Sequence, residues 1–308
     1  MIRTCLLLCS FCYLLLATTG AAAQTLPPTD SLQSLVADGA KVELIVKQFS
    51  FTEGPAVDKK GNIFFTDQPN DKIYKYDTEG KVSLFLDKTG RSNGLYFDKK
   101  GNIIACADEK DELWRITPAG KVTVMMTGYN GYQLNGPNDL WLNAKEGVYF
   151  TDPYYQRNYW TRQHPDSGLG GQKVYYLAPG KKEPVMIADG FNRPNGIVGS
   201  KDGKTLYIAD IGASKIYKYT INKDASLSNR ELFVARGADG MTLDNKGNLY
   251  LCGNGVAVYN PRGEKVAQID VPEKWTANAC FGGKDRNILF ITASEAIYKI
   301  NMKVKGIE

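Results

Sequence analysis

One short pattern recurs six times along this chain, and it limits the fold more than any other feature. Each copy begins with a residue that carries a carboxylate or amide oxygen, and a short apolar run follows, as in Asn93-Gly94-Leu95-Tyr96-Phe97. Successive copies begin 39 to 57 residues apart. Self-similarity at about 40–50 residues indicates a propeller or a solenoid. The opening residues of the copies are Glu53, Asn93, Asn138, Asn195, Asp239 and Asn278.

Within each repeat the sequence predicts four short strands separated by turns. In the first repeat a strand follows Glu53, and turn signals separate further strands over residues 63–67, 72–76 and 82–86. One four-stranded blade cannot cover its own apolar faces, whereas blades arranged in a ring bury them against one another. The sequence therefore predicts an all-β fold, a six-bladed β-propeller with four-stranded blades.

The two ends of the predicted ring are incomplete. Only 30 residues follow Asn278, which is too few for a whole blade. Residues 42–49 form a spare strand candidate before the first repeat. We expect this N-terminal strand to become the outermost strand of the last blade and to close the ring, so that the propeller spans residues 42–308.

The first residues of the chain have the pattern of a targeting segment. Arg3 precedes an apolar stretch over residues 6–16, and small residues at 21–23 resemble a cleavage site. The sequence therefore predicts a signal peptide over residues 1–23 and a polar leader over residues 24–41. The mature chain, which has no predicted membrane span, is expected to be exported to the periplasm or the extracellular space.

Composition and motifs argue against several functions. The formal net charge is +5 without long basic runs, which gives no reason to expect a nucleic-acid partner. The single histidine, His164, lies in an insertion over residues 154–172, so a Ser-His-Asp triad or a multi-histidine metal site is hard to build. No glycine-rich phosphate loop opens a helix. Outside the signal segment the cysteines fall in strand-like runs and are expected to be buried free thiols: Cys106, Cys252 and Cys280.

The chemistry is expected where the repeats meet. The first strand of each propeller blade lines the central channel, so residues at equal positions converge on the axis. Two carboxylates and four amides would meet there, and hard oxygen ligands suit Ca²⁺, or secondarily Mg²⁺ or Mn²⁺. Burying both carboxylates without a cation would be costly. The alternative is that Asn-Gly and Asp-Gly are ordinary turn dipeptides, but this does not account for Glu53.

The motifs that contain these residues resemble the gluconolactonase/regucalcin (senescence-marker-protein-like) family of six-bladed propeller lactonases. The likeness runs from about Phe51 to Thr292. It rests on residues 51–55 (FTEGP), 134–140 (LNGPNDL), 149–153 (YFTDP), 193–196 (RPNG), 238–241 (ADGM) and 280–285 (CFGGKD).

The resemblance implies one divalent cation in the central channel, held by Glu53, Asn195 and Asp239, with Asn138 contacting the metal or the substrate. It also implies that Asp239 is the catalytic acid/base. Ca²⁺ is the favoured ion, with Mg²⁺, Mn²⁺ and Zn²⁺ as alternatives. One departure from the regucalcin branch is Gly136, which stands where that branch carries an arginine for lactone contacts.

The predicted reaction is therefore metal-dependent hydrolysis of a small, sugar-type lactone by a monomer. The cation would polarise the ring carbonyl, and Asp239 would deprotonate water and then protonate the leaving oxygen. Asn138 and Asn93 would orient the substrate. Asp152 is predicted either to bind substrate and support the site, or only to cap a turn. Two alternatives stay open: organophosphate-ester hydrolysis on the same ligand set, and a non-catalytic secreted propeller that binds calcium structurally.

Overall fold

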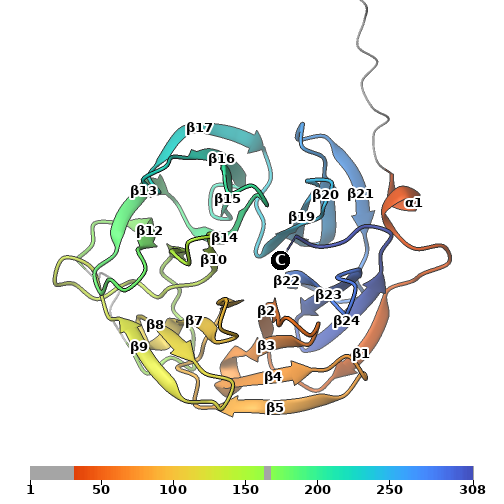
Figure 1. The fold of residues 1–308 in the computed structure, drawn as a ribbon, viewed down its shortest axis with the longest axis horizontal. Coiled ribbons are helices and arrows are strands. Elements are labelled where there is room, and N and C mark those ends of the chain that lie inside the picture. The colour runs from red at the N-terminus through yellow and green to blue at the C-terminus, as the bar shows by residue number, and fades with distance from the viewer. Residues whose placement is uncertain (1–30, 163–167, 308) are drawn as a thin grey trace, which may run out of the picture.

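Six separate sheets, each of four antiparallel strands, surround a central axis in the computed structural model (Figure 1). The structure describes residues 31–162 and 168–307. The predicted six-bladed, four-stranded propeller is confirmed. The predicted signal peptide and His164 lie outside the described residues. In the described part of the chain, no helix has the length and apolar character needed to cross a membrane.

The blades follow one another along the chain, and each runs from the axis outward. The first blade contains β2 (Thr52–Val57), β3 (Ile63–Asp67), β4 (Lys72–Tyr76) and β5 (Val82–Asp87). The second blade contains β6 (Leu95–Phe97), β7 (Ile103–Ala107), β8 (Glu112–Ile116) and β9 (Val122–Met126). The third blade contains β10 (Leu140–Leu142), β11 (Val148–Asp152), β12 (Gln172–Leu177) and β13 (Val185–Phe191). The fourth blade contains β14 (Pro194–Gly199), β15 (Thr205–Asp210), β16 (Lys215–Ile221) and β17 (Leu227–Val234). The fifth blade contains β18 (Met241–Leu243), β19 (Leu249–Gly253), β20 (Gly255–Tyr259) and β21 (Lys265–Ile269). The sixth blade contains β22 (Thr276–Gly282), β23 (Ile288–Ala293), β24 (Ala296–Asn301) and β1 (Glu43–Lys47).

The ring closes as predicted, because β1 is the outermost strand of the last blade. It pairs antiparallel with β24, from Glu43 opposite Lys299 to Lys47 opposite Ala296. The short helix α1 (Leu32–Leu35), in the described part of the predicted leader, precedes it. Leu35 is fully buried, and the Lys303 N–H donates to its carbonyl at 2.8 Å. The two ends of the chain are therefore joined by both backbone bonds and apolar contact.

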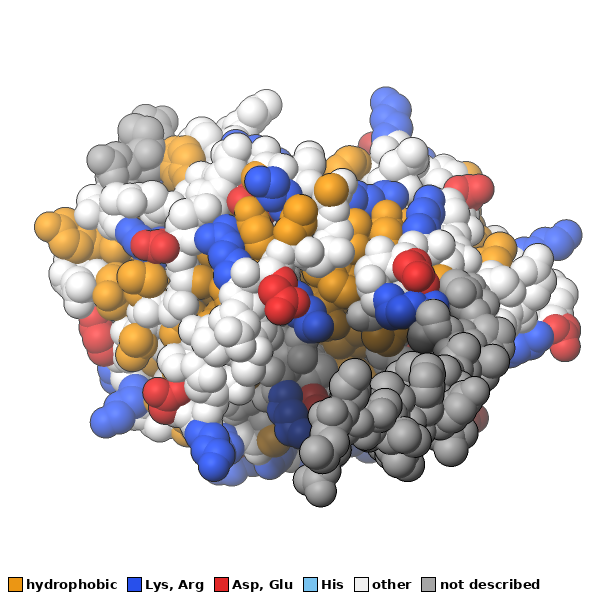
Figure 2. Space-filling view, turned by 90° about the horizontal axis from the view of Figure 1, so that it is seen from above, with side chains coloured by type: hydrophobic (Ala, Val, Ile, Leu, Met, Phe, Trp, Pro, Cys, Tyr) orange, Lys and Arg blue, Asp and Glu red, His pale blue; other side chains and the backbone are white. Residues whose placement is uncertain are grey.

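Apolar layers between neighbouring blades form the core. The two inner strands of most blades are buried along most of their length, as in the all-buried runs of β3 and β19. Cys106, Cys252 and Cys280 are buried in these layers as thiols that form no disulfide, as predicted. On the outer surface seen in Figure 2, basic and acidic side chains are scattered among hydrophobic ones. Apolar contacts between neighbouring blades thus stabilise the molecule, and polar side chains lie at the axis.

The two mouths of the central channel differ in what covers them. The turns between the first and second strand of each blade form one mouth, and the C-terminal segment crosses it, where the Gly306 N–H donates to the Arg286 carbonyl. The other mouth holds the start of each first strand and the end of each second strand, because these strands are antiparallel. The insertion after β11 and the 3₁₀ turns η1 (Gln68–Asn70) and η2 (Asp108–Lys110) therefore lie at this second mouth.

Candidate active site

The repeated oxygen-bearing residues do meet at the axis. Five of the six line one cavity of about 330 Å³: Glu53, Asn93, Asn138, Asn195 and Asp239. Each lies at or just before the start of the innermost strand of its blade. All five side chains are at least nine-tenths buried, so a ligand that reaches them is largely removed from bulk water.

The glycines that follow these residues are required by close packing between blades, and the turn-dipeptide alternative is wrong here. Asn195 and Gly196 lie inside β14. A Cβ on Gly196 would lie 2.3 Å from the Asp239 carbonyl oxygen, and one on Gly54 would lie 1.9 Å from the Asn93 carbonyl oxygen. The Gly196 N–H donates to the Asp239 carbonyl at 2.9 Å. Neighbouring inner strands thus approach closely enough to bond, which brings the preceding side chains together.

Two carboxylates line the cavity, and their charges are poorly balanced by hydrogen bonds. Burial raises the pKa of Glu53 well above its usual range, and the charge of Asp239 raises it further, against the lowering effect of the Gly54 N–H. Burial raises the pKa of Asp239 to about 6, although a hydrogen bond from Trp275 and the charge of Arg157 oppose the rise. This is the electrostatic setting in which a bound cation lowers the cost of two neighbouring negative charges.

A third buried carboxylate, that of Asp139, lies beside these two and was not predicted as a site residue. Its pKa is raised to about 7, mainly by burial and also by the charge of Asp239. Its Oδ1 accepts the Leu140 N–H at 2.9 Å. The sequence signal was available, because Asp139 occupies the position held by glycine in four other copies of the pattern. Gly94 makes room for this side chain, since a Cβ there would lie 2.6 Å from the Asp139 carboxylate.

The sixth member of the pattern, Asn278, supports the carboxylates from outside the cavity lining. Its side-chain amide oxygen accepts the Ala279 N–H at 2.8 Å. Its side chain also hydrogen-bonds to Glu53 and Asp139 and lowers the pKa of both. The six opening residues of the repeated pattern therefore supply five residues that line the cavity and one, Asn278, that positions the carboxylates.

The amides of the cavity have oxygens available for a cation. The amide nitrogen of Asn195 donates to the Tyr155 hydroxyl at 2.9 Å, which leaves its oxygen for a ligand. Among the described residues, the side chains of Asn93 and Asn138 form no hydrogen bond. The described chain has no cluster of three or more His, Cys, Asp or Glu side chains suited to a metal. The donor set is two carboxylates with amides, all hard oxygen ligands, and this set fits Ca²⁺.

Asp152 lies outside the cavity lining, so the prediction that it binds substrate does not fit its position. Its carboxylate accepts the N–H groups of Asn135 at 3.0 Å and Gly136 at 2.9 Å. It therefore caps the loop that leads to Asn138, the second of the two roles predicted for it. Gly136 is required in this loop, because its φ is +133° and a Cβ would lie 2.5 Å from the Arg162 guanidinium.

Seven lining residues lie outside the repeated register, and four of these have side chains that can donate hydrogen bonds. Tyr155 and Arg157 come from the insertion, Arg193 precedes β14, and Trp275 precedes β22. The indole N–H of Trp275 donates to Asp239 Oδ2 at 2.6 Å and so favours the ionised carboxylate. The aromatic and basic composition of the insertion was the only sequence signal for Tyr155 and Arg157, and the location of the insertion after β11 brings them to the axis.

A propeller whose axial cavity combines two carboxylates with three amides defines a recognisable class of protein. Residues 38–295 match the family model described as the SMP-30/Gluconolactonase/LRE-like region. The chain belongs to this family, as the resemblance of its motifs predicted.

Individual relatives agree with this assignment. The chain is 27% identical over 321 residues to a gluconolactonase of Zymomonas mobilis subsp. mobilis, covering 94% of this chain and 88% of that protein. A gluconolactonase structure from Xanthomonas campestris superposes with a TM-score of 0.83 at 25% identity, covering 89% of this chain and 93% of that one. A regucalcin structure from Agrobacterium tumefaciens, at 18% identity and a TM-score of 0.71, shares the fold; 85% of this chain and 94% of that one are covered.

Proposed function

We propose that this chain hydrolyses a sugar-type lactone in the axial cavity, with one divalent cation bound by Glu53, Asn195, Asp239 and Asn138. The observation that carries the proposal is the convergence of these four side chains on one cavity. The gluconolactonase relatives from Zymomonas mobilis and Xanthomonas campestris support the lactone as substrate. The donor set supports Ca²⁺ as the ion.

The residues of the chain carry out the proton transfers. Asp239 takes a proton from the attacking water, whose oxygen forms a bond to the ring carbonyl carbon. The ring C–O bond then breaks, and the same carboxyl group returns the proton to the leaving oxygen, so that a hydroxy acid is released. Trp275 holds one oxygen of Asp239 at 2.6 Å and thereby fixes the direction of the other. When bound, the divalent cation supplies Lewis acidity toward the ring carbonyl.

The amides and Tyr155 position the substrate. Asn93 and Asn138 have no other hydrogen-bond partners in the described chain and can bond to the ring hydroxyls. Burial raises the pKa of Tyr155, so its hydroxyl stays protonated and remains a donor. Asn93 and Asn138 are themselves buried, which limits the access of bulk water to them and strengthens these contacts.

The experiment is proton release from glucono-δ-lactone, recorded by pH-stat on the purified protein before and after chelation. Turnover should disappear after chelation and return with Ca²⁺, and Asp239→Asn should abolish it. Asp202→Asn, a change at an exposed carboxylate in the β14–β15 turn at the opposite mouth and outside the cavity lining, is the control and should keep turnover. Full activity of the chelated protein would contradict the metal-dependent mechanism. Hydrolysis of a phosphotriester but of no lactone would favour the organophosphate alternative.

A further inference from the structure

Two arginines of the cavity have no carboxylate partner in the described chain. Arg157 and Arg193 both line the cavity. The Nε of Arg157 is buried and lacks any hydrogen-bond partner. Arg162 of the same insertion also has a buried Nε without a partner, but both of its terminal nitrogens form ion pairs, with Asp108 at 2.9 Å and with Asp111. A buried guanidinium nitrogen without a partner is costly, which indicates that a ligand supplies the missing acceptor.

Both guanidiniums are held in place before a ligand arrives. The Arg157 guanidinium stacks on the Tyr155 ring at 4.6 Å, and that of Arg193 stacks on the same ring at 5.0 Å. Tyr155 is fixed in turn by its 2.9 Å hydrogen bond from Asn195. Stacking on an aromatic ring orients a guanidinium while leaving its N–H edge free to bind an anion.

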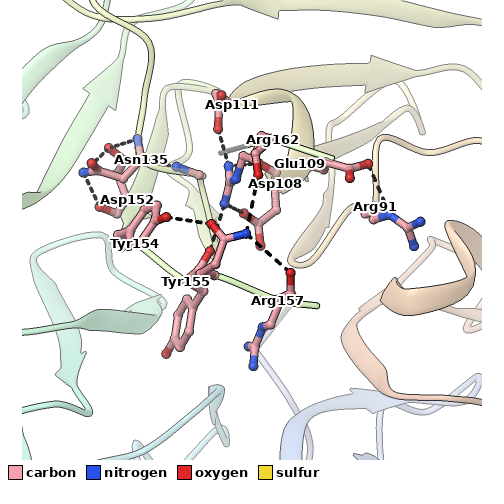
Figure 3. Close-up of polar contacts among 12 residues, drawn as sticks. Arg91, Asp108, Glu109, Asp111, Asn135, Asp152, Tyr154, Tyr155, Arg157 and Arg162 are labelled. Atoms are coloured by element: carbon pink, nitrogen blue, oxygen red, sulfur yellow. Dashed lines mark hydrogen bonds and ion pairs between the residues drawn. The ribbon is translucent and has the colours of Figure 1, made fainter. Parts of the chain in front are cut away.

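The loop that carries Arg157 is anchored at its far end. The Arg162 ion pairs tie it to η2, and the Thr161 N–H donates to Glu109 at 2.7 Å. In Figure 3 Tyr155 and Arg157 point away from this Arg162 network. The loop therefore presents Arg157 to the cavity from a fixed base, and Arg162 is the residue that secures this base.

The charges of the cavity indicate what the arginines bind. A divalent cation offsets the charges of Glu53 and Asp239, and even with Asp139 ionised the two guanidiniums leave one positive charge in excess. A neutral lactone has no group that requires them, whereas the planar guanidinium matches a carboxylate or a phosphate. Arg193 is exposed and Arg157 is partly buried, whereas the five axial residues are buried. The two arginines therefore lie nearer to solvent, where the part of a substrate remote from its lactone ring would lie.

We propose, on the basis of the lactonase function above, that the substrate is an acidic lactone: a sugar lactone with a second, anionic group, carboxylate or phosphate. Arg157 and Arg193 bind this group while the ring ester lies over Asp239 and the axial amides. The two arginines determine specificity and take no part in the proton transfers.

The experiment compares three lactones of the same ring: glucono-δ-lactone, its 6-phosphate, and the corresponding 6-carboxylate, glucaro-δ-lactone. The wild-type kcat/KM should be at least tenfold higher for one acidic lactone than for the neutral one, and which one is preferred identifies the anion. Arg157→Gln and Arg193→Gln should each lower this ratio about tenfold, equivalent to about 1.4 kcal/mol. Because Arg193 is exposed, its variant should fold even if the Arg157 variant does not.

Arg230→Gln is the matched control. Arg230 is also exposed and stacked on an aromatic ring, with its guanidinium 3.9 Å from the Tyr217 centroid, but it lies outside the cavity lining. This variant should leave the preference ratio unchanged. Equal kcat/KM for the three lactones, or a ratio that does not change in Arg193→Gln, would overturn the inference while leaving the lactonase function intact.

A binding measurement separates failure of the inference from failure of the proposed function. The ring-opened acids 6-phosphogluconate and glucarate should raise the melting temperature more than gluconate does, and Arg193→Gln should remove the difference. If no lactone is hydrolysed but this Arg193-dependent difference persists, the reaction is wrong and the anion site stands. If the three acids have equal effects on the wild-type protein, the anion site is wrong.

Discussion

Replacing Gly196 with alanine tests whether the inner strands must touch for the site to form. The new Cβ would lie 2.3 Å from the Asp239 carbonyl oxygen, whereas ordinary contact begins at 3.4 Å. The two main chains must therefore separate by about 1.1 Å, the difference between these values. The Gly196 backbone conformation is itself accessible to alanine, because its φ lies outside the left-handed range. The effect is therefore purely steric.

Both stability and activity should fall in this variant. Overpacking typically costs about 1–3 kcal/mol, and loss of the Gly196 to Asp239 hydrogen bond about 0.5–1.5 kcal/mol. We expect the free energy of unfolding to drop by roughly 2–4 kcal/mol. Because Asn195 and Asp239 move apart, kcat/KM should fall about 100-fold, the usual consequence of a misplacement of about 1 Å.

The control separates stability from geometry. Gly203, in the turn of the same blade, has a φ of +68° and no atom within 4 Å of its Cβ position. Gly203→Ala should therefore cost about 1–2 kcal/mol through backbone strain without moving the blades, and should keep its activity. Urea unfolding gives the free energies, and the pH-stat assay at a temperature where both variants are folded gives kcat/KM. An activity of Gly196→Ala equal to that of Gly203→Ala would refute the steric argument.

Three further predictions concern the cation, the loop cap and the closing strand. Cation affinity should weaken as the pH falls through about 6, because Asp239 then holds a proton that the cation must displace. Calorimetry in buffers of different ionisation enthalpy should detect the release of this proton. An affinity that does not change with pH would contradict the prediction. Asp152→Asn should lower the free energy of unfolding by about 1–3 kcal/mol, because the amide N–H₂ replaces one of the two accepting oxygens and then faces a backbone N–H donor. A substrate-binding role instead predicts a raised KM at unchanged stability in the same assays. Deletion of residues 31–47 should abolish the single cooperative melting transition seen by calorimetry, because β24 loses its partner strand β1 and the buried Leu35 is removed. Retention of that transition at the wild-type temperature would count against closure of the ring by β1.

Much of this fold follows from the sequence alone because it is periodic. An oxygen-bearing residue before an apolar run recurs six times, so equal positions in successive blades must lie at equal distances from one axis. For that reason Glu53, Asn195 and Asp239 were placed together correctly, although they are far apart in the chain. Likewise, only one position in the predicted ring was unfilled, that of the outermost strand in the last blade, and the spare strand before the first repeat could occupy it.

The rest depended on contacts that periodicity does not describe. Asp139 and Asn278 belong to the repeated pattern, but the direction of each side chain depends on the neighbouring blade: Asp139 Oδ2 accepts the Ile197 N–H at 3.4 Å, and the Asn278 amide lies against Gly240. Asp152 could cap a loop or bind a ligand from the same position, and only its two backbone partners decide between these roles. Tyr155 and Arg157 lie in an insertion, which has no equivalent in the other blades. Their positions at the cavity are fixed by bonds to the adjacent blades, and such bonds exist only once these blades have packed together.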